Sequence, residues 1–282
     1  MICALASAVC FGAASVLQAV ATRAIAPGTG SGVDPGLLMR VLKQWRYLAG
    51  LGLDGLGFVL QIVALRHIPI YAVGAALAGS LAVTALIATR MLDIRLSRAE
   101  WTAIVVVCAG LAMVGLAAGA EGERSGSDAL KWALLVASVV MVLLGAAGGR
   151  LPDKARALVL GLMAGLGFGV VQVAVRLIDE ISVGELLTNP ATYALLIGGG
   201  GAFLLLTSAL QRGSVPTATA GLVLGETIAP SLVGVIWLGD ETRAGFAWLA
   251  VLGFAVAVAG ALALARFGEA PVEETAQGGT PA

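Results

Sequence analysis

Residues 132 to 175 read WALLVASVVMVLLGAAGGRLPDKARALVLGLMAGLGFGVVQVAV. Two apolar runs, 132 to 148 and 157 to 175, flank a short turn that holds every charged residue of the stretch. A helix needs roughly 20 mostly apolar residues to cross a bilayer, so each run has about the length of one transmembrane helix. The stretch therefore predicts two successive membrane-spanning helices joined by a basic turn.

The same pattern continues in both directions along the chain. Of its 282 residues, 59% are hydrophobic and 12% are charged, which leaves too few polar side chains to cover a soluble protein of this size. We therefore expect an all-α integral membrane protein with about nine transmembrane helices, nine or ten. The nine apolar runs cover residues 2 to 22, 47 to 65, 68 to 89, 101 to 119, 132 to 148, 157 to 175, 191 to 211, 215 to 238 and 245 to 265.

The composition argues against several functional classes. The 17 basic and 17 acidic residues give a net charge of zero, which does not suggest a nucleic-acid partner. The single histidine, His67, and three cysteines without paired spacing leave no basis for a histidine triad, a zinc site or a disulfide framework. No nucleotide-binding fingerprint is present. We expect neither an enzyme nor a cofactor, and the residues do not define a metal site.

The orientation follows from the basic residues in the short loops. With alternating spans, twelve Lys and Arg residues fall on one side and five on the other. This predicts an outside N-terminus and a cytoplasmic C-terminus in the plasma membrane. The first run is expected to be a span and not a signal peptide, because its first basic residue, Arg23, follows it. The acidic tail, residues 268 to 282, is expected to be disordered.

The chain contains an internal repeat. At a separation of 147 residues, Pro69, Gly74, Asp93 and Trp101 fall on Pro216, Gly221, Asp240 and Trp248; further matches occur at 145, and Phe11-Gly12 falls on Phe168-Gly169 at 157. The first four spans thus correspond to the last four, and a displacement of five spans turns the second copy upside down. The predicted units are residues 1–120 and 157–267, two inverted four-helix repeats, with a connecting helix and loops at 121–156.

These motifs resemble a known group of proteins. Phe11-Gly12, Ala64-Leu65 before Pro69, and the turn RMLDIRLS at 90 to 97 before Trp101 resemble the drug/metabolite transporter superfamily. The nine-span layout resembles its EamA-like and NIPA-like branch. Phe-Gly stands where that superfamily usually has Trp-Gly, and Met91-Leu92-Asp93 stands where it has Leu-Gly-Glu. The resemblance implies an alternating-access transporter, and its NIPA-like side implies magnesium transport.

Only two charged side chains fall inside predicted spans, Asp54 and Glu226. An ionised acid at the bilayer centre costs about 3 kcal/mol or more, so such residues normally face a cavity or an ion pathway. The alternatives are that Asp54 lies nearer the membrane surface, or that either acid is protonated and bonds a neighbouring helix. Pro230 follows Glu226 by one turn and frees its backbone carbonyl, which suits a helix kink, a gate or a packing device.

Other polar groups could line the same pathway. Thr227 and Ser231 flank Pro230, and Gln18, Gln61 and Gln172 lie in the middle of other spans. Gln18 and Gln172 belong to corresponding helices of the two repeats, and we expect both to reach the repeat interface. Each polar group could instead bond a neighbouring helix, and Thr207 and Ser208 are expected to bond back to their own helix.

The leading hypothesis is a secondary transporter of a small metabolite, coupled to protons through Glu226. A divalent cation transporter of the NIPA-like type is the second hypothesis. Magnesium usually binds carboxylates, and the two acids in the predicted spans are few for such a site. A membrane scaffold or accessory subunit without transport is the third. The expected partners are membrane lipids and a small-molecule or cation substrate, and a homo-oligomer is compatible with the sequence. The substrate, the direction and the coupling ion stay open.

Overall fold

The structure, a computed structural model, describes residues 2–25, 35–65, 77, 79–93, 95–120, 126–178, 182–212 and 214–267. The tail at 268–282, with Pro69, Gly74 and His67, lies outside these ranges. Within them the chain is helical, with one isolated β-bridge. The elements are α1 (Ile2–Arg23), α2 (Pro35–Val41), α3 (Trp45–Leu65), α5 (Ser80–Met91), α6 (Arg98–Ala117), α7 (Asp128–Gly148), α8 (Asp153–Arg176), α9 (Val183–Thr188), α10 (Pro190–Arg212), α11 (Val215–Val233), the π-helix η1 (Gly234–Leu238) and α12 (Ala247–Phe267).

Polar caps define where several helices begin. At the start of α6, the backbone N–H of Ser97 donates to Oε2 of Glu100 over 2.6 Å, and the N–H of Glu100 donates to the Ser97 hydroxyl oxygen over 3.2 Å. This reciprocal pair satisfies two N–H groups that have no partner inside the helix. Ser127 caps α7 with a single bond, in which its hydroxyl oxygen accepts the N–H of Leu130. These helices therefore start where a short polar segment meets a long apolar run.

Seven helices in the described part of the chain are long and apolar enough to cross a membrane: α1, α6, α7, α8, α10, α11 with η1, and α12. They coincide with seven of the nine predicted spans. The other two predicted spans fall on α3, of 21 residues, and on α5, whose 12 residues cover the second half of the predicted span 68 to 89; most of the first half lies outside the described ranges. The chain is thus a multi-pass helical membrane protein.

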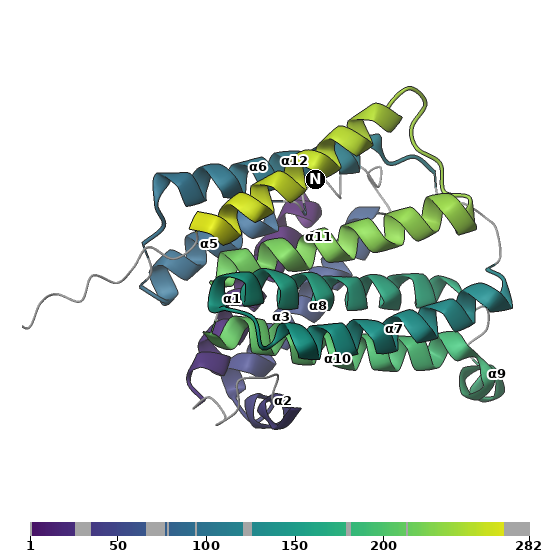
Figure 1. Ribbon diagram of the computed structural model, residues 1–282, viewed down its shortest axis with the longest axis horizontal. Helices are drawn as coiled ribbons and strands as arrows, with labels where there is room; N and C mark the ends of the chain where they lie inside the picture. The colour runs from purple at the N-terminus through teal and green to yellow at the C-terminus, as the bar shows by residue number, and fades with distance from the viewer. Residues whose placement is uncertain are drawn as a thin grey trace, which may run out of the picture.

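Helices from the two halves of the chain pack against one another. α1 packs against α3 and α5, α8 packs against α10 and α11, and α6 lies along α12. Figure 1 shows α6 and α12 together at one edge of the molecule, α7 and α10 at the opposite edge, and α8 and α11 between them. α1 also contacts α10, and α5 contacts α11. The core is therefore built from both halves and not from two separate bundles.

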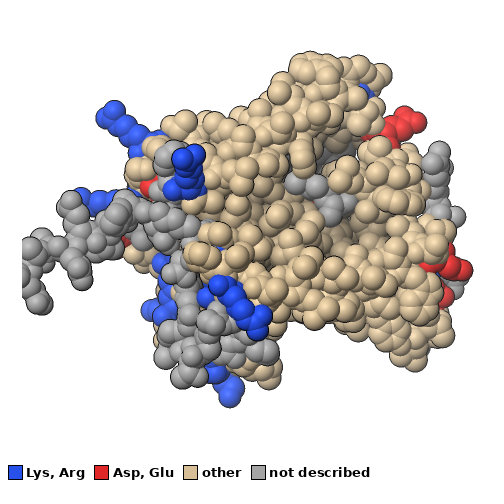
Figure 2. Space-filling view, viewed as in Figure 1, with Lys and Arg blue, Asp and Glu red and all other residues tan. Residues whose placement is uncertain are grey.

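Charges are segregated along the helix direction. Figure 2 shows Lys and Arg side chains gathered at one end of the molecule, Asp and Glu mainly at the other, and an uncharged belt between them. The basic end is where α1, α5 and α12 finish, with Arg23, Arg90 and Arg266 in their last turns. The acidic end is where α7 begins with Asp128 and where α9 carries Glu185. An uncharged belt between charged ends is the surface expected of a protein whose middle lies in hydrocarbon.

Candidate functional site

Asp54 lies in the middle of α3, where that helix meets α1. The side-chain amide of Gln18 donates a hydrogen bond to Oδ2 of Asp54 over 2.6 Å, and Gln18 is 2% exposed. The helices approach closely because residue 50 is a glycine: a Cβ there would lie 2.8 Å from Cγ of Gln18. Further along the same contact, the Ser7 hydroxyl donates to the carbonyl of Gly57 over 2.7 Å. The structure thus brings together two of the residues that the sequence selected.

Glu226 lies on α11, in the second half of the chain. Its side chain is partly buried, and its carboxyl group interacts electrostatically with that of Asp54. α11 lies against α8 with almost no side chain between them: a Cβ at Gly165 would be 2.9 Å from the backbone N of Glu226, and one at Gly225 would be 2.6 Å from the backbone N of Leu166. Small residues therefore allow the backbones to touch and fix the position of Glu226.

Neither carboxyl group has a basic partner among the residues that the structure describes. Ion pairs in the described chain, such as Lys131–Asp128 and Arg176–Asp240, involve other acids. Two ionised acids would be costly inside a membrane, and a bound proton or cation would remove that cost. The described chain contains no group of three His, Cys, Asp or Glu side chains arranged to hold a metal ion. The pair is therefore suited to a proton, or to a cation that brings other ligands with it.

A second polar contact joins α3 to α10. The Tyr47 hydroxyl lies 2.9 Å from Oγ1 of Thr207, and both residues are 1% exposed. The Thr207 hydroxyl donates its one hydrogen to the carbonyl of Phe203, over 2.6 Å. Tyr47 is therefore the donor in its contact with Thr207. The expected back-bonding of Thr207 is confirmed, as is that of Ser208, which donates to Leu204 over 2.8 Å.

Sequence reasoning missed Tyr47. It stands at the beginning of a predicted span, where tyrosine is common as an interfacial residue. Its spacing could have revealed it, because Tyr47, Asp54 and Gln61 follow one another at intervals of seven and lie on one face of α3. Gln61 is partly buried on that face. The face of α3 that carries Asp54 thus has a polar side chain every seventh residue, from Tyr47 to Gln61.

Pro230 does not interrupt its helix. α11 continues past it into the π-helical turn η1, an element that often occurs at functional sites. Because proline has no N–H, the carbonyl of Glu226 lacks its usual partner four residues later. The hydroxyls of Thr227 and Ser231 each donate to the backbone carbonyl one turn earlier, over 2.6 Å. Their protons are therefore engaged within α11, close to the proline.

Gln172 lies elsewhere than expected. Its side chain is exposed on α8 and does not join the contact between Gln18 and Asp54. The reason is the register of the repeat. At the separation of 157 residues, Gln172 corresponds to Ser15, whereas Gln18 corresponds to Val175. The two glutamines belong to corresponding helices but to different faces of them.

The acidic end is held together by an ion pair and by backbone pairing. Arg176, at the end of α8, donates from Nη1 and Nη2 to both carboxylate oxygens of Asp240, each over 2.8 Å. Asp240 follows η1, and its own N–H donates to the carbonyl of Gly234. The segment after α6 pairs with the same loop: Gly119 N–H donates to Glu241 O, and Glu241 N–H donates to Ala120 O. Three helices are thus joined at this end.

Comparison of the chain with models of protein families, with curated proteins and with solved structures finds no match.

Proposed function

We propose that this chain is a secondary transporter of the drug/metabolite type, which moves a small metabolite by alternating access and couples to protons through Asp54 and Glu226. One observation carries the proposal: a pair of interacting carboxyl groups, without a basic partner in the described chain, is assembled from both halves. Ionisable residues inside a membrane are rare and commonly mark proton or ion pathways, so two acids without a described basic partner are candidates for carrying a proton or a cation.

The proposal includes nine transmembrane helices in two inverted repeats. The sequence offsets relate α1 to α8, α3 to α10, α5 to α11 and α6 to α12. The packing supports this relation, because α1 lies against α3 and α5 just as α8 lies against α10 and α11. Inverted repeats of this kind place substrate sites at their interface. The carboxyl groups of Asp54 from one repeat and Glu226 from the other interact electrostatically, as expected of a site at such an interface.

The crossing of α6 and α12 supports the same symmetry. The offset of 147 residues relates Gly110 to Ala257, and a Cβ on Gly110 would lie 2.8 Å from Cα of Ala257. A residue that touches its own repeat partner lies on the axis relating two copies. The neighbouring contacts obey the same symmetry. Gly253 lies against Met113, and the residues related to them by the offset of 147, Val106 and Gly260, also lie against each other.

In the proposed orientation the basic end is cytoplasmic and the acidic end faces outside, in the plasma membrane. The ion pair of Arg176 with Asp240 then closes the outer end. Its repeat counterpart at the basic end is missing, because Asp93 is exposed there and the partner position of Arg176 is Ala19. The structure would thus represent a state closed to the outside, and breaking this pair would accompany opening.

A divalent cation transporter is the second candidate. The electrostatic interaction between Asp54 and Glu226 favours it, since their two carboxylates and the carbonyl of Glu226 freed by Pro230 are hard oxygen ligands. Magnesium keeps several waters when bound, so it needs few protein ligands but strict geometry. A non-transporting membrane scaffold is the third reading, and it predicts no flux of any solute.

The test is uptake by the purified chain in proteoliposomes, against a panel of metabolites and of Mg²⁺ and Mn²⁺, with and without a pH gradient. The proposal expects a metabolite to accumulate against its gradient only when a pH gradient is imposed. Cation uptake that ignores the pH gradient would favour the second candidate. Liposomes that are silent for the whole panel, and in which no metabolite exchanges downhill, would contradict transport.

A further inference from the structure

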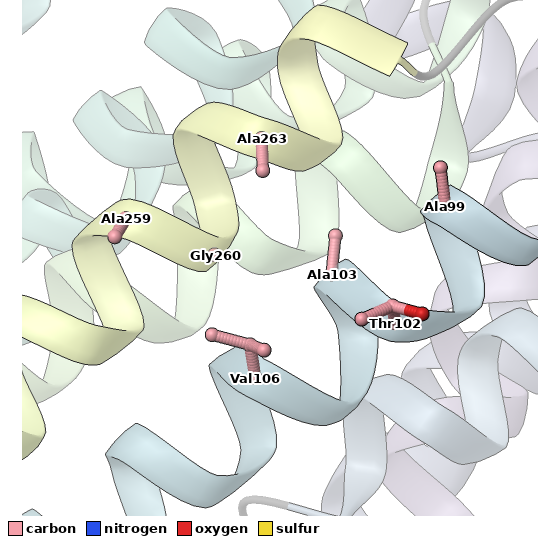
Figure 3. Close-up of a pocket in the computed structure, with 7 residues that line it drawn as sticks. All are labelled: Ala99, Thr102, Ala103, Val106, Ala259, Gly260 and Ala263. Carbon is pink, nitrogen blue, oxygen red and sulfur yellow. The ribbon is translucent and has the colours of Figure 1, made fainter.

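A groove opens between α6 and α12 on the lateral surface of the helix bundle. It lies on the basic side of the close crossing at Gly110 and Gly253. Small side chains face one another there and leave a volume of about 350 Å³. Figure 3 shows them on the two facing helices, Ala99, Ala103 and Val106 from α6, and Ala259, Gly260 and Ala263 from α12.

The groove is apolar and lies on a lipid-facing surface. Its one hydroxyl, that of Thr102, donates to the carbonyl of Arg98 over 2.9 Å and so offers no free donor. The same helices expose Val105 (62%) and Leu262 (58%). Apolar side chains exposed to this degree on a membrane helix face hydrocarbon. An alkyl chain is the occupant that an apolar groove in hydrocarbon can accept without loss of hydrogen bonds.

Two arginines stand at the basic end of the groove. Arg98 directly precedes Ala99, and Arg266 follows Ala263 by three residues, so each lies within one turn of a lining residue. Both side chains are exposed, and they stand at the start of α6 and in the last turn of α12, at the basic end. The acid nearest in sequence, Glu100, is 5% exposed and caps its own helix. Among the described residues that flank the groove, the exposed charges are therefore positive.

We propose that the groove binds one acyl chain of a phospholipid whose anionic headgroup is held by Arg98 and Arg266. The polarity of the site matches such a lipid from end to end, apolar along the groove and basic at the level of the headgroups. A second copy of the chain fits less well. A two-fold contact through this groove would bring the positive charges of Arg98 and Arg266 of both copies together. The site is independent of the proposed transport.

The test uses the purified full chain and native mass spectrometry with added dioleoyl phosphatidylglycerol or dioleoyl phosphatidylcholine. The parent should retain one phosphatidylglycerol in preference to phosphatidylcholine. Replacing the exposed alanines at the groove edges, Ala99→Leu with Ala259→Leu, should lower the affinity for both lipids by roughly tenfold, because the acyl chain is displaced. Arg98→Gln and Arg266→Gln should each lower the affinity for phosphatidylglycerol alone, by about fivefold.

Matched controls separate the groove from the rest of the surface. Ala133→Leu with Ala146→Leu makes the same change on the exposed face of α7, and Arg150→Gln removes a basic charge from the end of that helix. Both should bind lipid like the parent, and their thermal stability provides the folding reference. If the groove-filling variant is equally stable and retains phosphatidylglycerol as the parent does, the proposal is wrong. It is also wrong if that variant changes a dimer into a monomer without changing lipid retention.

Discussion

Gln18 donates a 2.6 Å hydrogen bond to Asp54 and thereby ties α1 to the polar face of α3. Both helices belong to the first half of the chain, and the carboxyl group of Asp54 interacts across the halves with Glu226. The contact needs a closely packed pair of helices, and it needs an amide long enough to cross between them. A change in the packing of α1 against α3 would therefore act on Asp54 through its hydrogen bond with Gln18.

The first prediction concerns Gly50. Gly50→Ala places a methyl group 2.8 Å from Cγ of Gln18 and should displace the amide from Asp54. We expect a loss of about 1–3 kcal/mol in stability from overpacking, measured by reversible unfolding in detergent. Gly52→Ala is the matched control on the same helix, since its Cβ would meet nothing within 4 Å. Equal stability of the two variants would show that the contact does not depend on Gly50.

The second prediction concerns Tyr47 and Thr207, whose side chains form the described contact between α3 and α10. In a double-mutant cycle, Tyr47→Phe and Thr207→Val should couple by about 0.6 kcal/mol, and by no more than about 1.7. Ser208→Ala serves as the control, because Ser208 bonds only within its own helix in the described structure. Additive effects for Tyr47 with Thr207 would exclude the hydrogen bond as a stabilising contact.

The third prediction concerns the ion pair at the acidic end. Arg176→Gln should raise labelling of a cysteine placed at Thr227 by an impermeant maleimide added at that side, by about fivefold, because a partly exposed ion pair contributes up to about 1 kcal/mol. Exchanging the charges, Arg176→Asp with Asp240→Arg, should restore the parental labelling. Asp128→Asn, which breaks the other ion pair described at that end, should have no effect. Equal labelling rates with and without the Arg176→Gln change would show that Arg176 has no role in closing this end.

The fourth prediction is topological. Reporters fused within residues 121 to 128 should be active outside the cell, and reporters fused after Phe267 should be active inside. The reason is the excess of Lys and Arg at the basic end, where α12 finishes. Two fusions reporting the same side would mean an even number of spans between the two sites and would remove the inverted repeat.

Much of the architecture is readable from the sequence because long apolar runs have one stable form in a membrane, the helix. Asp54, Glu226 and Gln18 were identifiable for the same reason, since polar groups stand out in an apolar segment. Gln172 and Tyr47 show the limit. Which face of α8 Gln172 occupies depends on how α8 rotates against α10 and α11, and Tyr47 acquires its partner from a helix about 160 residues later. The pairing of Arg176 with Asp240 also depends on tertiary packing that no local pattern encodes.

The measurement that tests the central claim most directly is uphill transport by Glu226→Gln in proteoliposomes with an imposed pH gradient. Glutamine keeps the size and hydrogen bonding of glutamate but cannot exchange a proton, and Glu241→Gln is the control at an exposed position. The account predicts that Glu226→Gln loses accumulation driven by the pH gradient while downhill exchange of the same substrate continues, and that Glu241→Gln behaves as the parent. Accumulation by Glu226→Gln at the parental rate, with an unchanged dependence on pH, would contradict it.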